Sequence, residues 1–95
     1  MLDNGRYIAA RQEGDMDDYH ITVDFKETEK SYILTLIEND SRYGASQIED
    51  MFRKNKRVLI KKSGDKHCVK SWDDNSFTLY PYRVGVPYLF EMPKN

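Results

Sequence analysis

The chain of 95 residues is long enough for one small domain, and its 15 basic residues nearly balance its 16 acidic residues. That balance excludes a uniformly basic coat protein for nucleic acid and a strongly acidic tail protein. The aromatic fraction of 13% is too high for a disordered chain. The one cysteine, Cys68, excludes an internal disulfide and a cysteine-rich zinc site.

Alternation of apolar and polar residues predicts short strands along most of the chain. The clearest lies at 19–25, where one face would carry Tyr19, Ile21, Val23 and Phe25. The segment 31–38 is apolar on both faces, which is typical of a central strand that is covered on both sides. Further strands are expected at 6–11, 57–62, 67–72, 77–80 and 88–92.

One segment, 46–55, has the pattern of an amphipathic helix. Ser46 and Glu49 have the spacing of a capping box, and Ile48, Met51 and Phe52 form a single apolar stripe. A helix of about three turns does not stand alone in water and must pack on other elements. We therefore expect it to cover the second face of the strand at 31–38.

Together these elements predict an α+β fold in a single domain over residues 1–95, in the order β-β-β-α-β-β-β. The sheet would be mostly antiparallel and twisted, with about five to seven short strands and one amphipathic helix. Gly64, in the short connector 63–66, predicts a hairpin between 57–62 and 67–72. A small, partly open barrel plugged by the helix is the alternative.

The near-zero net charge combines two blocks of opposite sign. Residues 1–52 carry five basic and twelve acidic residues, whereas residues 53–72 carry eight basic residues and one acidic residue. The basic block has four open interpretations: it follows a phosphate backbone, binds an acidic protein, docks on the acidic half of its own chain, or faces solvent. Its candidate contact residues are Lys54, Lys56, Arg57, Lys61, Lys62, Lys66 and Lys70.

The acidic residues of 13–29 form the mirror image of that block. Carboxylates spaced along a strand and a loop can imitate a row of phosphates, although a plain solvated loop is the alternative. The spacing lacks the Gly at the sixth place and the Glu at the twelfth that an EF-hand calcium loop needs. The candidate residues for binding a partner are Asp15, Asp17, Asp18, Asp24, Glu27 and Glu29.

Aromatic residues are frequent near the C-terminus, and at alternate strand positions they are most often core. Tyr and Arg are also enriched at protein–protein hot spots, and aromatic rings stack on unpaired bases. Pro81 and Pro87 interrupt regular strand pairing, which favours a presented loop. The candidates for contact with a partner are Tyr80, Tyr82, Arg83 and Tyr88.

No pattern of an enzyme accompanies these residues. His67 and Cys68 are neighbours on an expected strand and point to opposite faces, so the histidine could not easily activate the thiol. No P-loop, nucleophile elbow, dinucleotide fingerprint or zinc-protease motif occurs. We expect no catalytic residue, no cofactor and no metal. Without a signal peptide or a membrane-length apolar run, we also expect a cytoplasmic protein with no membrane contact.

The chain is short, rich in Tyr, Lys and Asp, free of catalytic motifs and segregated in charge, and it contains the segment WDDNSFTLYPYRVGVPYLFE at 72–91. In these respects it resembles the small accessory proteins of phages and mobile genetic elements, and among them the anti-CRISPR proteins. This resemblance implies a non-enzymatic inhibitor that binds a host defence nuclease or nucleoprotein complex and blocks its nucleic-acid site. It transfers no individual residue.

Two alternatives remain open beside that resemblance. The first is a small RNA- or DNA-binding protein that uses residues 53–72, with Tyr80 and Tyr82 stacking on bases. The second is a structural or homodimerising module that uses an exposed edge strand. The oligomeric state is open between monomer and homodimer.

Overall fold

The computed structural model describes residues 1–11, 19–41, 51–52, 56–81 and 87–93. These residues form seven strands: β1 (Gly5–Arg11), β2 (Tyr19–Glu27), β3 (Ser31–Ser41), β4 (Arg57–Lys61), β5 (Cys68–Asp73), β6 (Ser76–Tyr80) and β7 (Tyr88–Glu91). All seven belong to one sheet with the order β4-β3-β2-β1-β7-β6-β5, and every neighbouring pair is antiparallel.

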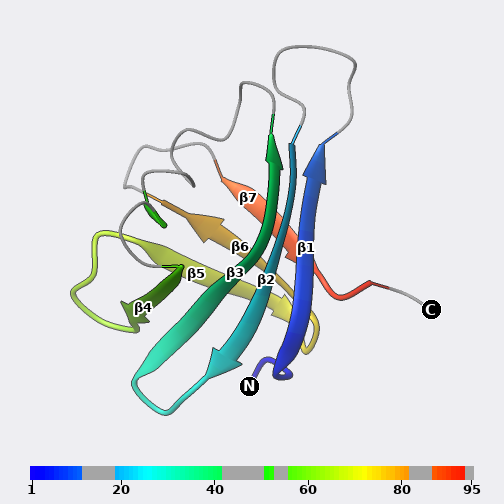
Figure 1. The fold of residues 1–95 in the computed structure, drawn as a ribbon. Helices are drawn as coiled ribbons and strands as arrows, with labels where there is room; N and C mark the ends of the chain where they lie inside the picture. The colour runs from blue at the N-terminus through cyan, green and yellow to red at the C-terminus, as the bar shows by residue number, and fades with distance from the viewer. Residues whose placement is uncertain (12–18, 42–50, 53–55, 82–86, 94–95) are drawn as a thin grey trace.

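The sheet consists of two meanders that are joined where β1 pairs with β7. Strands β1 to β4 follow one another across one half of the sheet, and β5 to β7 follow one another across the other half. The join is short, with Ile8 opposite Glu91. The sheet curls strongly, so that β5 and β6 cross behind β2 and β3 and the whole forms an open half-barrel (Figure 1).

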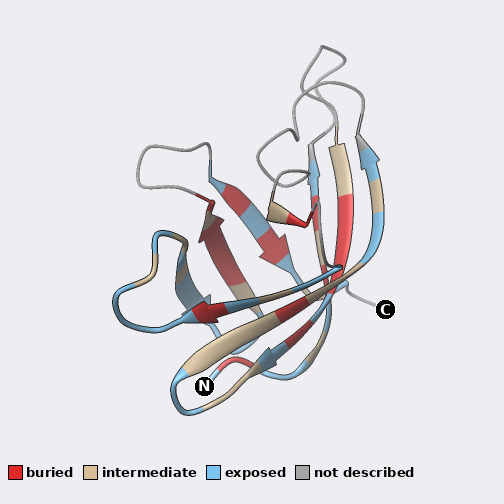
Figure 2. Ribbon diagram, turned by 60° about the vertical axis from the view of Figure 1, so that its left-hand side comes forward, coloured by how far each residue is buried: buried red, intermediate tan, exposed pale blue. Residues whose placement is uncertain are grey.

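Aromatic residues on the inner faces of the two meanders fill the half-barrel. The ring of Phe77 on β6 lies 5.0 Å from that of Tyr7 on β1 and 4.6 Å from that of Phe25 on β2. Phe90 on β7 stacks on Phe77 at 5.2 Å. These four side chains are buried, and buried segments lie on strands of both halves (Figure 2). The curled sheet therefore covers its own inner face.

The predicted alternation along β2 is confirmed except at Thr22, which is buried beside the bulge between Thr22 and Val23. Ile21, Val23 and Phe25 are buried in the core, whereas Asp24 between them is exposed. The predicted central place of β3 is only partly correct, because β3 is an inner strand between β2 and β4 but lies second from the edge of the sheet.

The predicted α+β class is wrong, because the described residues form an all-β sheet with no helix among its elements. Of the predicted helix, only Met51 and Phe52 belong to the described residues, and both pack on the core. The expectation assumed that the outer face of β3 needs a cover. Ile37 on β3 is instead 45% exposed, at a bulge where no residue of β2 lies opposite it. The fold is closer to the partly open barrel.

The predicted hairpin between 57–62 and 67–72 is also wrong. β4 and β5 are the two edges of the sheet and are not paired with each other. Six antiparallel steps separate them in the strand order, so both run in the same formal direction. Parallel neighbours need a crossover of about a dozen residues or more, and the loop from Lys62 to His67 is too short for one. Each of these two strands therefore has one edge without a strand partner among the described residues.

Candidate functional site

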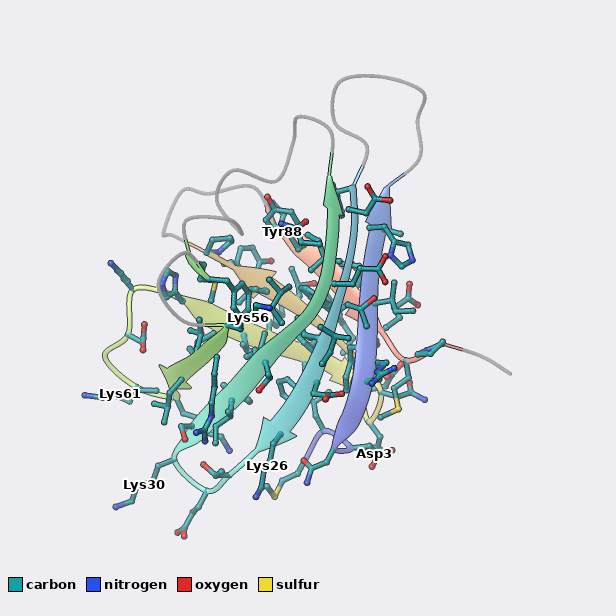
Figure 3. All side chains as sticks on the ribbon, in the orientation of Figure 1. Asp3, Lys26, Lys30, Lys56, Lys61 and Tyr88 are labelled. Carbon is teal, nitrogen blue, oxygen red and sulfur yellow. The ribbon has the colours of Figure 1, made fainter. Side chains whose placement is uncertain are left out.

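Most of the basic candidates lie in the stretch that runs from just before β4 to β5, the two edge strands of the sheet. Lys56 lies just before β4, and Arg57 and Lys61 are exposed on β4. Lys62 and Lys66 lie in the loop after β4, and Lys70 lies on β5. We call these six residues the basic rim. Figure 3 shows Lys61 and the neighbouring Lys30 pointing into solvent on this side of the molecule. Lys54 lies outside the described residues.

The backbone of β4 adds hydrogen-bond donors to this rim. The Leu36 N–H donates to the Lys56 carbonyl at 2.6 Å, and the Lys62 N–H donates to the Lys30 carbonyl at 2.9 Å. Even-numbered residues of this stretch therefore bond to β3. The alternate residues Arg57 and Leu59 direct their N–H and carbonyl groups toward the open edge.

Asp65 organises the loop that joins the two edges. Its carboxylate accepts hydrogen bonds from the Lys61 N–H at 2.9 Å and from the His67 N–H at 3.0 Å. Burial acts to raise the pKa of Asp65, but these bonds outweigh it and the pKa is lowered. Gly64 takes a φ of +78°, which an L side chain rarely adopts. The hydrogen bonds of Asp65 and the backbone conformation of Gly64 therefore fix the shape of this loop.

His67 connects the end of this loop to the other meander. Its Nδ1 forms a hydrogen bond with the Pro81 carbonyl, directly after β6. The carbonyl can only accept, so the neutral ring carries its proton on Nδ1. Burial lowers the pKa of His67, which keeps the ring neutral. His67 therefore acts as a structural tie at this position.

Lys62 has a strong internal partner. Its Nζ lies 2.7 Å from Oε2 of Glu27 and 5.2 Å from the centre of the Tyr32 ring. The Glu27 side chain is only 8% exposed and also accepts the Leu2 N–H at 2.7 Å. Burial would raise the pKa of Glu27, but the hydrogen bonds from Lys62 and Leu2 lower it. Through this ion pair the acidic block of residues 1–52 contacts the basic block of residues 53–72.

The rest of β4 lacks such a partner. Within the described residues, no carboxylate forms a salt bridge with Lys56, Arg57 or Lys61. Leu59 between them is 54% exposed. It helps to line a shallow depression of about 550 Å³, together with Glu29, Lys30, Lys61, Lys62 and Ser63. This edge therefore offers positive charge, backbone donors and a small apolar surface to a ligand.

The acidic candidates are not assembled into a row by the described strands. Asp24 lies on the outer face of β2 and pairs with Arg6 at 3.6 Å, Glu27 is directed inward, and Glu29 is exposed in the turn before β3. Asp15, Asp17 and Asp18 lie outside the described residues. The described part of the chain thus shows no copy of a phosphate backbone.

The aromatic candidates separate into core and surface. Tyr88 is fully buried and packs edge-on against Tyr19 at 5.2 Å, so its side chain is not available to a partner. Tyr80 is half-buried on β6. Tyr82 and Arg83 lie outside the described residues.

Trp72 on β5 is a surface aromatic residue that sequence reasoning did not select. It is 58% exposed. Its Nε1 donates to Oγ1 of Thr78 at 2.6 Å, and Nζ of Lys70 lies 4.7 Å from the ring centre. Proximity to the aromatic C-terminal segment favoured a core position. The signal for exposure was its place two residues after Lys70, on the same face of a regular strand, directly before the acidic turn that begins at Asp73.

The described residues contain no group of three or more His, Cys, Asp or Glu side chains that could hold a metal ion. They also form no helix with the length and apolarity that crossing a bilayer requires. Comparison with known proteins found no matching family model, no similar curated protein and no similar solved structure. The basic rim is therefore the feature from which function is inferred.

Proposed function

We propose that the protein is a non-catalytic nucleic-acid-binding protein whose basic rim holds a phosphate backbone. The observation that supports this most strongly is the open edge of β4. There Lys56, Arg57 and Lys61 have no carboxylate partner among the described residues, and the backbone N–H groups of Arg57 and Leu59 point outward. Lys and Arg side chains together with backbone N–H groups are the usual donors to phosphate oxygens.

The expected strength of binding follows from release of counterions. Each phosphate that a Lys or Arg neutralises contributes a slope of about −0.7 to the dependence of log K on log salt for a single strand, and about −0.9 for a duplex. A few contacts of this kind give useful affinity at low salt. They also make that affinity fall steeply as the salt concentration rises.

A cytoplasmic site of action fits this proposal. Cys68 is a free and exposed thiol. Free thiols persist in reducing compartments, where nucleic acids and their complexes are also found.

The experiment compares two charge reversals on exposed lysines. Lys61→Glu changes the basic rim, and Lys26→Glu changes a lysine on the inner strand β2 (Figure 3). Fluorescence anisotropy with a labelled oligonucleotide at 50 mM salt should show a loss of about tenfold in affinity for Lys61→Glu. Lys26→Glu should bind almost as the unmodified protein does. Equal losses in the two variants would show that the rim has no special role.

The inhibitor function that the anti-CRISPR resemblance implies stays a prediction. It requires co-elution with a defence nuclease and arrest of cleavage in vitro. Its phosphate-mimic mechanism further requires that Asp15→Lys, Asp17→Lys and Asp18→Lys together abolish the arrest. A protein that binds oligonucleotides through the rim and leaves the nuclease active would contradict it.

A further inference from the structure

Trp72 lies at a bulge in the edge strand β5. Ser71 is opposite Phe77 and Asp73 is opposite Ser76, which leaves Trp72 without a residue opposite it on β6. A bulge re-aims the side chains at its position and commonly occurs beside functional sites. Here it accompanies a large aromatic side chain that remains 58% exposed.

The indole ring is held in a defined orientation despite this exposure. Its Nε1 donates to Oγ1 of Thr78 at 2.6 Å, and Thr78 is only 7% exposed. A ring that is fixed before binding loses little conformational entropy when a ligand stacks on it. The exposed Trp72 is therefore preorganised.

Charges of both signs lie near the indole ring. Lys70 places its Nζ 4.7 Å from the ring centre, and β5 leads back from there to the loop of the basic rim. Trp72 also lines a hollow of about 300 Å³ whose other lining residues include Glu27, Asp73 and Asp74. The Lys70 ammonium attracts a phosphate group, whereas the carboxylates that line the hollow repel it. An uncharged ring can lie next to the hollow.

We infer that Trp72 is the stacking platform for one unpaired base of a single-stranded nucleic acid, with Lys70 at the phosphate beside that base. This inference rests on the proposed function and narrows its ligand to single strands. The bases of a duplex are stacked on one another, so they do not present a free face to the indole.

The test uses the fact that Trp72 is the sole tryptophan of the chain. Its fluorescence is titrated with a 12-residue single strand, a 12-base-pair duplex and heparin, which carries negative charge without bases. Binding of each ligand is followed separately, by anisotropy of a labelled copy. The single strand should quench the tryptophan fluorescence at the concentrations at which it binds. The duplex and heparin should not quench it when they bind.

Three variants complete the test. Trp72→Ala should weaken single-strand binding by about 5- to 100-fold and leave duplex binding unchanged. Trp72→Phe, which keeps a ring, should recover part of that loss. Leu89→Ala removes another exposed apolar side chain, 48% exposed on β7, and should change neither affinity.

The outcomes separate the two proposals. Single-strand binding without quenching, or with full affinity in Trp72→Ala, would overturn the stacking site and leave the basic rim intact. Quenching by heparin equal to that by the single strand would also overturn stacking, since heparin has no base. Absence of binding to every ligand would overturn the proposed function and the stacking site together.

Discussion

Glu27 connects three parts of the molecule through one carboxylate. It accepts the Leu2 N–H and the Lys62 ammonium, both at 2.7 Å, from the end of β2. The N-terminal segment and the loop after β4 are thereby fixed to the same point. Because the side chain is only 8% exposed, water does not easily replace a lost partner.

Glu27→Gln should therefore lower the free energy of unfolding by about 2 kcal/mol, as expected for losing a charge-assisted hydrogen bond. Asp24→Asn is the control, because the pair of Asp24 with Arg6 is about half exposed and 3.6 Å long. Its loss should cost about 0.5 kcal/mol or less. Urea denaturation at pH 7 measures both, and equal costs would show that Glu27 is not an anchor.

The same carboxylate predicts a dependence of stability on pH. Its pKa in the folded state is lowered from the ordinary value of 4.5. The stabilisation is therefore fully present above about pH 4.5 and is lost as the pH falls through the folded pKa. The difference in stability between the unmodified protein and Glu27→Gln should shrink over this acid range. A difference that stays constant down to pH 3 would contradict the lowered pKa.

At the scale of elements, the open edge of β4 is the main departure from the sequence-based expectation. In a hairpin with β5, Leu59 would donate its N–H across to that strand. In the structure the pairing with β3 leaves this N–H at the edge, while Ile60 pairs with Tyr32. The two neighbouring amides should differ sharply in protection from solvent.

Amide hydrogen exchange followed by NMR tests this alternation. The amides of Val58 and Ile60 should exchange slowly, because they face β3, and those of Arg57 and Leu59 should exchange much faster. The Lys61 amide should be intermediate, since it donates to the half-buried loop residue Asp65 rather than to a strand. Slow exchange at Leu59 in the isolated monomer would mean that β4 has a second strand partner.

The strands themselves could be predicted because their signals are local. Alternation identified β2, and the polar run that begins at Asp73 identified the turn before β6. The partner of each strand could not be predicted in the same way. A short connector that contains Gly64 is typical of a hairpin, yet here it bridges the two edges of a curled sheet. The direction of β5 is set by β6 and β7, which follow it in the chain.

At the scale of the whole molecule, long-range aromatic contacts decide the architecture. Phe77 is separated in sequence from Tyr7 and Phe25 by most of the chain, and their contact curls the sheet around its own core. Sequence patterns do not reveal such pairs, so a helix over 46–55 was the nearest available cover for the sheet. The strand order makes β4 and β5 the two edges of the sheet, and residues 56–70 carry the basic rim along them. The positive charge of that segment could be counted from the sequence, but its position on the two edge strands could not be predicted from the sequence.

The basic rim is the central claim, and the salt dependence of binding tests it most directly. Affinity for a labelled single strand is measured by anisotropy between 50 and 300 mM salt, and log K is plotted against log salt. About four phosphate contacts predict a slope near −3, and Lys61→Glu should reduce its magnitude by about 0.7. A slope near zero, or the same slope in the unmodified protein and in Lys61→Glu, would contradict the claim.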